Sequence, residues 1–137
     1  MAMKYSEIEE AFLFVSSGGL GENEAYIDLE NEKIYWHSEY ECFDELPDDI
    51  AEKKYLLAPH KNELGLGKPL VMNFIYEYSP KDLEEIHSIF SRKGAYAKFK
   101  SFLKINNLLD EWYSYEAHNT KDAIRQWCSE NGVELSG

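Results

Sequence analysis

The chain has 137 residues, of which 44% are apolar and 15% aromatic, and its formal net charge is −12. This length and apolar content predict one domain over residues 1–137 that buries about two thirds of its unfolded surface, and they argue against intrinsic disorder. No apolar run approaches the roughly 20 residues of a membrane-spanning helix, and no basic-then-apolar leader opens the chain, so we expect a cytoplasmic protein without membrane contact.

A helix is predicted near the start of the chain. Ser6 and Glu9 have the spacing of a capping box, in which the serine accepts a hydrogen bond from the third amide and the glutamate reaches back. The apolar residues that follow recur at helical spacing: Ile8, Ala11, Phe12 and Val15. Gly18 and Gly19 are predicted to end this helix, because glycine readily takes the left-handed conformation of a helix C-cap.

A small antiparallel sheet of about three strands is predicted within residues 24–58. Residues 25–29 and 33–37 are rich in Tyr, Ile and Trp and alternate apolar with polar side chains, which is typical of strands. The residues between them favour a tight hairpin turn, in which Asn31 tolerates a positive φ. Residues 55–58 form a short apolar run that ends at a proline, which indicates an edge strand.

An acidic stretch separates the second and third predicted strands. Residues 39–52 contain seven acidic side chains and no basic one. They lack the central glycine of a calcium-binding loop, so we interpret them as a solvated or partner-facing loop, with a short helix from Pro47 to Lys53. Imitation of DNA phosphates by these carboxylates is an alternative interpretation.

The second half of the chain is predicted to be mainly helical. Apolar spacing predicts helices near residues 70–78, 83–90, 95–103 and 123–128. Ser79 followed by Pro80 is the clearest start signal, because serine caps helices and proline fits the first helical position. Residues 108–118 fit a separate helix, a continuation of the last helix or an extended segment. The order of elements predicts an α+β fold in which four or five helices pack with the small sheet.

Among the aromatic residues of this half, two tryptophans are predicted to lie in the core. They are Trp112 and Trp127, because large aromatic side chains usually form the main core of a helical segment. Tyr113 and Tyr115 fit either the core or the wall of a pocket.

Three motifs of the second half form a recognisable set. They are G-A-Y-A-K-F-K at residues 94–100, Trp112-Tyr113, and a closing helix that contains Ala123 and Trp127. Together they resemble the signature of a bacterial family of uncharacterised proteins of the UPF class. The resemblance extends from about residue 25 to residue 133 and includes the first predicted strand.

The chain departs from this family at two places. Asn31-Glu32 stands where the family usually has a glycine turn, and Cys128 stands where an aliphatic residue is usual. Neither departure affects the expected fold. The resemblance implies a compact bacterial cytosolic domain, and it supplies no catalytic residues because none are established for the family.

Basic charge is concentrated in one segment. Five basic residues and no acidic one lie between residues 88 and 108, so this segment carries +5 and the remainder of the chain −17. We name residues 92–104 the basic strip. The candidate binding residues are its lysines and two tyrosines: Lys93, Tyr96, Lys98, Lys100, Lys104 and Tyr113. Such residues contact phosphates and stack on bases, but they are also typical of the solvated face of an amphipathic helix or of a protein-docking surface.

No other pattern predicts a metal, cofactor or catalytic site. The spacing of Glu84 and His87 is that of a di-iron motif, but such sites need the motif twice. Asp28 is predicted to have a structural role, either exposed or hydrogen-bonded to a backbone amide. Cys42 and Cys128 are predicted to be reduced, Cys42 near the surface and Cys128 in the core.

We therefore expect a non-catalytic binding or regulatory module that docks a protein partner or associates with itself. A nucleic-acid-binding protein that uses the basic strip is an alternative, disfavoured because the net charge repels phosphate. A hydrolase whose Asp, Glu and His residues are brought together by folding is a third hypothesis.

Overall fold

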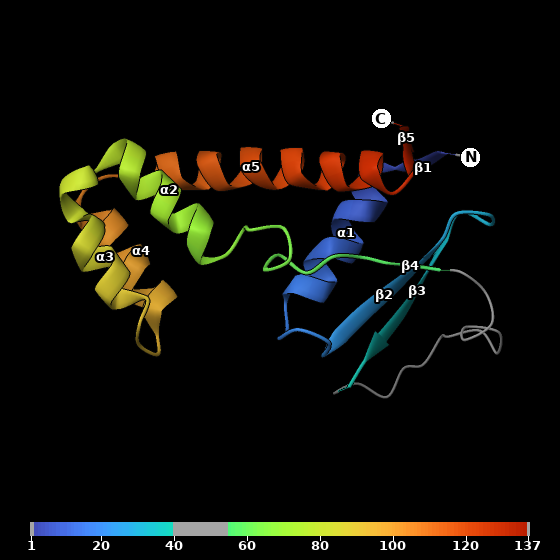
Figure 1. The fold of residues 1–137 in the computed structure, drawn as a ribbon, viewed down its shortest axis with the longest axis horizontal. Helices are drawn as coiled ribbons and strands as arrows, with labels where there is room; N and C mark the ends of the chain where they lie inside the picture. Colours follow the sequence, from blue (N-terminus) through green and yellow to red (C-terminus); the bar gives the residue numbers. More distant parts are fainter. Residues whose placement is uncertain (1, 40–54, 137) are drawn as a thin grey trace. The chain divides into compact units, whose positions relative to one another are not determined.

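The described chain, residues 2–39 and 55–136 of a computed structural model, contains five α-helices and five short strands. The strands are β1 (Ala2–Lys4), β2 (Asn23–Asp28), β3 (Lys33–Ser38), β4 (Leu56–Leu57) and β5 (Glu134–Ser136). The helices are α1 (Tyr5–Ser16), α2 (Lys68–Tyr78), α3 (Leu83–Ile89), α4 (Ala95–Ile105) and α5 (Leu109–Glu130), with a 3₁₀ turn, η1 (Pro80–Asp82), before α3. The α+β fold class is confirmed, and the second half is helical as predicted (Figure 1).

Contacts between residues divide the chain into two compact units. The first comprises Met1–Leu64 with Lys121–Gly137, and the second comprises Gly65–Thr120. Helix α5 belongs to the second unit up to residue 120 and to the first unit after it. The single domain over residues 1–137 stays a prediction. Cys42, the helix predicted from Pro47, and all of the acidic stretch except Glu39 lie outside the described residues.

The first unit contains the predicted three-stranded sheet. Its order is β3-β2-β4, and both pairings are antiparallel. Strand β4 pairs at only two positions and lies at the edge, as the short apolar run before Pro59 predicted. Helix α1 packs on β2, and the Phe14 ring meets Trp36 of β3 edge-on at 5.2 Å. The four residues of the predicted helical stripe are all buried: Ile8, Ala11, Phe12 and Val15.

The predicted ends of α1 are wrong in detail. The helix begins at Tyr5 with Lys4 as its N-cap, and no side chain caps it, so Ser6 lies inside the helix. The reason is that β1 runs directly into α1. Instead of reaching back to the N-cap as predicted, the Glu9 carboxylate accepts a hydrogen bond from the Tyr5 hydroxyl at 3.0 Å. At the other end, the helix stops at Ser16, and the first left-handed glycine is Gly21, not Gly18 or Gly19.

The β2–β3 hairpin depends on a buried carboxylate. Asp28 is only 3% exposed, and its carboxylate accepts hydrogen bonds from the backbone amides of Glu30 and Asn31 at 3.1 and 3.2 Å. The Asn31 side-chain amide donates to the same carboxylate at 2.8 Å. These bonds hold Asn31 inside the turn, and Glu32 takes the positive φ that was predicted for Asn31. The predicted structural role of Asp28 is confirmed.

Strands β1 and β5 form a second, two-stranded sheet that the sequence pattern did not reveal. They pair in parallel, with Met3 opposite Leu135, so the two ends of the chain lie side by side (Figure 1). Three residues are too few to show the alternation that identifies a strand. The Met3 side chain is nevertheless buried.

The second unit is a helical cluster built from α2, α3, α4 and the first part of α5. Its core joins the predicted apolar stripes: Leu70, Val71, Phe74, Ile75, Ile86, Phe99, Phe102, Leu103 and Trp112. Residues 108–118 begin a helix that continues to Glu130, which is one of the three arrangements expected. Helix α3 ends at Ile89, and Gly94, with φ 76°, is the N-cap of α4.

Ser79, which was predicted to start a helix, is the N-cap of the 3₁₀ turn η1, and the α-helix α3 follows this turn. The Ser79 hydroxyl donates a hydrogen bond to the Asp82 carboxylate, and the Asp82 amide donates to the Ser79 carbonyl at 2.9 Å. Helix α3 then begins at Leu83. No helix among the described residues is both long and apolar enough to cross a membrane.

Because the Asp28 carboxylate accepts several hydrogen bonds in the turn, we expect substitutions that remove different numbers of them to destabilise the protein by different amounts. Asp28→Ala leaves two backbone amides of the turn without their acceptor, so we expect the free energy of unfolding to fall by about 1–3 kcal/mol. Asn31→Ala removes only the side-chain bond and should cost less. Urea denaturation of the three proteins measures the difference, and an equal loss in both variants would contradict this role of the carboxylate.

Candidate functional site

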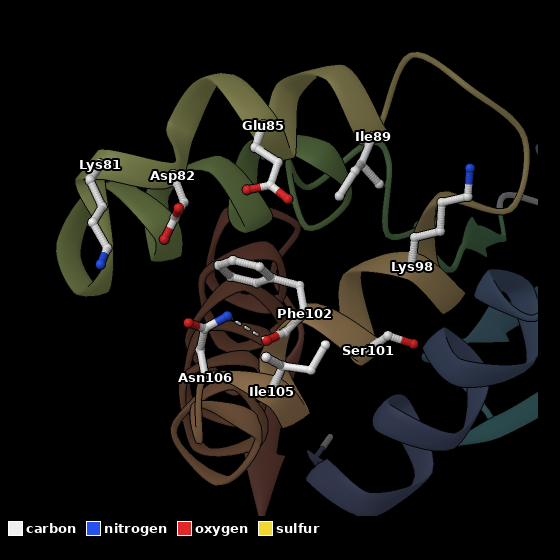
Figure 2. A pocket seen from close by; sticks show the side chains of 9 residues that line it. All are labelled: Lys81, Asp82, Glu85, Ile89, Lys98, Ser101, Phe102, Ile105 and Asn106. Atoms are coloured by element: carbon white, nitrogen blue, oxygen red, sulfur yellow. Dashed lines mark hydrogen bonds between the residues drawn. The ribbon is translucent and has the colours of Figure 1, made fainter.

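Helix α4 presents the predicted binding residues on two different sides. Its buried stripe is formed by Phe99, Phe102 and Leu103. Tyr96, Lys100 and Lys104 follow one another at intervals of four, so they lie along one flank of this stripe. Lys98 lies at its other edge, where it faces α3 (Figure 2). Lys93 is exposed in the turn before α4.

The first side is shared with α5, and we name it the α4–α5 face: Tyr96, Lys100, Lys104 and Tyr113. The Lys100 ammonium lies 5.9 Å from the centre of the Tyr113 ring, within the range of a cation–π contact. The Tyr96 ring packs edge-on against Phe90 at 5.1 Å. Burial, and to a lesser degree the charge of Glu116 on α5, raises the pKa of Tyr96.

Along this face, successive residues of α4 therefore lie near residues of α5 taken in the reverse order. Tyr96 lies near Glu116, Lys100 lies against Tyr113, and Lys104 shares a hollow of about 280 Å³ with Leu109 and Asp110. The Asp110 carboxylate reduces the positive potential around Lys104, and the Glu116 carboxylate adds negative charge near Tyr96. The face thus combines exposed aromatic rings with alternating charges and is not uniformly basic.

The second side of α4 forms a groove with η1 and α3, and we name it the α3–α4 groove. Its volume is about 430 Å³. Figure 2 shows Ile89, Phe102 and Ile105 directed into the groove between charged residues. The charged residues from η1 and α3 are Lys81, Asp82 and Glu85, and Lys98 lies on the α4 side.

A third hollow, of about 420 Å³, lies between the end of α2 and the first turns of α5. It is the place where titratable side chains gather: Tyr78, Asp110, Glu111, Tyr115 and His118, together with Ser114. Burial, then the charge of Glu77 and the nearby Tyr78, raises the pKa of Tyr115. Asp110, Glu111, Ser114 and His118 are exposed, so the hollow is open to solvent.

The other histidines and acids that the structure describes form no group suited to a metal ion. Among residues 2–39 and 55–136, no group of three or more His, Cys, Asp or Glu side chains is placed to hold a metal ion. Glu84 and His87 are both exposed on α3. His60, which the sequence pattern did not single out, is buried; its Nδ1 accepts from the Asn62 amide at 3.0 Å, and its Nε2 lies 2.8 Å from the Gly18 carbonyl oxygen. These contacts give His60 a structural role, because they connect the segment after β4 to the residues that follow α1.

Cys128 and Tyr5 belong to a structural cluster in the first unit. Cys128 is buried as predicted, it is a free thiol, and burial raises its pKa, which makes it a poor nucleophile. The Tyr5 ring lies against Arg125 at 5.2 Å and against Lys121 at 5.9 Å. Burial, followed by the hydrogen bond to Glu9, raises the pKa of Tyr5 to about 12, although Arg125 opposes this shift.

No family model, curated protein or solved structure matches this chain. Membership of the bacterial family that the G-A-Y-A-K-F-K and Trp112-Tyr113 motifs resemble therefore stays a prediction.

The Tyr5 phenol gives a test of this packing at alkaline pH. The tyrosinate absorbance of the wild type minus that of Tyr5→Phe should rise with a midpoint near pH 12. Because the folded state raises this pKa, the stability that the phenol contributes is complete below the unfolded pKa of about 10 and is lost as the pH rises through 12. Far-UV circular dichroism recorded alongside reports whether the protein is still folded. A difference titration centred near pH 10 in the folded protein would contradict the packing.

Proposed function

We propose that this protein is a non-catalytic binding module that docks a protein partner through the α4–α5 face. The observation that carries the proposal is that Tyr96 and Tyr113 are 42% and 46% exposed beside the Lys100 ammonium. Tyrosine is enriched at the centres of protein interfaces, where the ring supplies apolar area and the hydroxyl supplies a hydrogen bond. A tyrosine side chain also loses little conformational entropy on binding.

The charges of the face indicate what kind of segment it accepts. Lys100 and Lys104 favour carboxylates, whereas Glu116 near Tyr96 and Asp110 near Lys104 disfavour an unbroken acidic run. We infer that the partner supplies an apolar side chain to the exposed tyrosine rings and a carboxylate to Lys100. The bacterial cytosol, which the family resemblance implies, is part of the same proposal.

Docking of a nucleic acid is less well supported than docking of a protein. The basic strip would have to present its cations on one surface to neutralise successive phosphates. Lys98 lies on the opposite edge of the buried stripe from Lys100, and the whole chain carries −12.

We accordingly expect no binding of a fluorescent single-stranded or duplex oligonucleotide at low salt, because the separated lysines offer too few adjacent phosphate contacts. Fluorescence anisotropy at about 20 mM salt, where electrostatic binding is strongest, measures this. Saturable binding that weakens steeply with salt and is abolished by Lys98→Glu combined with Lys100→Glu would favour the nucleic-acid alternative instead.

The docking proposal is tested by photo-crosslinking in the cells that produce the protein. A benzophenone amino acid at position 113 should form a covalent adduct with a defined protein, and Lys100→Glu should reduce the yield of that adduct about tenfold by removing the contact to its carboxylate. The matched control is the same amino acid at position 76, because Tyr76 is a still more exposed tyrosine of the same unit but lies on α2. Equal adducts at both positions, or no adduct at position 113, would contradict the proposal.

A further inference from the structure

We propose that the α3–α4 groove docks onto the same groove of a second copy of this chain, forming a symmetric homodimer. This surface lies on the other side of α4 from the face that we assign to a protein partner. The inference therefore goes beyond the proposed function and can fail or succeed independently of it.

The groove exposes apolar surface that a second copy would cover. Ile105 is 80% exposed, the highest value among the large apolar side chains of the described residues. Its neighbours in the groove, Ile89 and Phe102, are partly buried and buried respectively. Covering Ile105 removes its side chain from water, which is the main driving force of association.

The two walls of the groove differ in net charge: Lys81 on the η1–α3 wall offsets one of its two carboxylates, so that wall is left with a net negative charge opposite the cation of the α4 wall. Asp82 and Glu85 lie on the η1–α3 wall, and Lys98 lies on the α4 wall. Figure 2 draws a hydrogen bond from the Asn106 side-chain amide to the Phe102 backbone carbonyl oxygen, and it draws none between Glu85 and Lys98. Both charges are therefore available to a second molecule.

A two-fold axis that runs along the groove turns these walls into complementary surfaces. Rotation about such an axis places the η1–α3 wall of each copy over the α4 wall of the other. In a symmetric contact, if Glu85 of one copy meets Lys98 of the other, the reverse pair forms as well. Two opposite-charge pairs thus flank the buried Ile105 side chains, and this self-complementarity is the reason for naming a second copy as the occupant.

The net charge of the unit that contains the groove does not oppose contact through this surface. The unit Gly65–Thr120 contains seven basic and seven acidic residues, so it is formally neutral, and the net charge of −12 resides in the remainder of the chain. The unit that contains the groove therefore adds no net like-charge repulsion between two copies.

The test measures association of the full chain by sedimentation equilibrium from about 1 µM to about 1 mM. The wild type should show a reversible monomer–dimer equilibrium. Glu85→Lys alone and Lys98→Glu alone should each weaken it about tenfold or more, because each converts two attractive pairs into two repulsive ones. An equimolar mixture of these two variants should recover wild-type association, since the heterodimer again pairs opposite charges at both positions.

Two further variants complete the test. Ile105→Asp should abolish the dimer, whereas Leu20→Asp, at an exposed apolar residue of the other unit, should leave it unchanged. A wild type that stays monomeric throughout would overturn the inference, and so would equal effects of the two aspartate variants. Rescue in the Glu85→Lys, Lys98→Glu double variant but not in the mixture would also overturn it, because the pair would then form within one chain.

Discussion

Burial of the Trp112 indole determines how the α4–α5 face and the α3–α4 groove are oriented in the helical unit. Phe74 of α2 and Phe99 of α4 contact this ring edge-on, at 5.2 and 5.0 Å. Because α4 must turn Phe99, Phe102 and Leu103 toward this core, its remaining side chains can occupy only the two flanks and the outer side of the helix. Both candidate surfaces follow from this constraint. One flank meets α5 and carries Lys100, whereas the other meets α3 and carries Lys98.

The distribution of charge between the two units changes how the net charge is to be interpreted. A value of −12 averaged over the chain suggests a molecule that repels every anionic partner. The helical unit is formally neutral, however, and on the α4–α5 face Asp110 lies in the hollow with Lys104 and Glu116 lies near Tyr96. A partner that binds a surface with mixed charges is recognised through the placement of individual charges, as is typical of protein interfaces. A phosphate backbone is instead attracted by many positive charges acting together.

The sequence pattern predicted the elements with long apolar repeats and failed where a contact between distant segments determined the local conformation. The stripes of α1 and α4 are buried as expected, because an amphipathic helix in a folded protein is stabilised mainly by the burial of its apolar face. The capping box at Ser6 failed because β1 pairs with β5 and leads the chain into the helix two residues earlier, with Lys4 in place of Ser6 as the N-cap. The hairpin was placed correctly, but the carboxylate of Asp28 moved its left-handed residue from Asn31 to Glu32.

By itself, the sequence determined the α+β class, the three-stranded sheet, the helical second half, the burial of Cys128 and the structural role of Asp28. These properties follow from local spacing and from the cost of burying an unpaired polar group, and both can be judged along the chain. Only the tertiary structure decided that the basic strip divides between two sides of α4, that Ile105 is exposed above a groove, and that the two ends of the chain pair in a parallel sheet. The physical reason is that the direction of a side chain on a helix depends on which neighbouring helix covers the core stripe, and that neighbour is chosen by packing between residues far apart in the sequence.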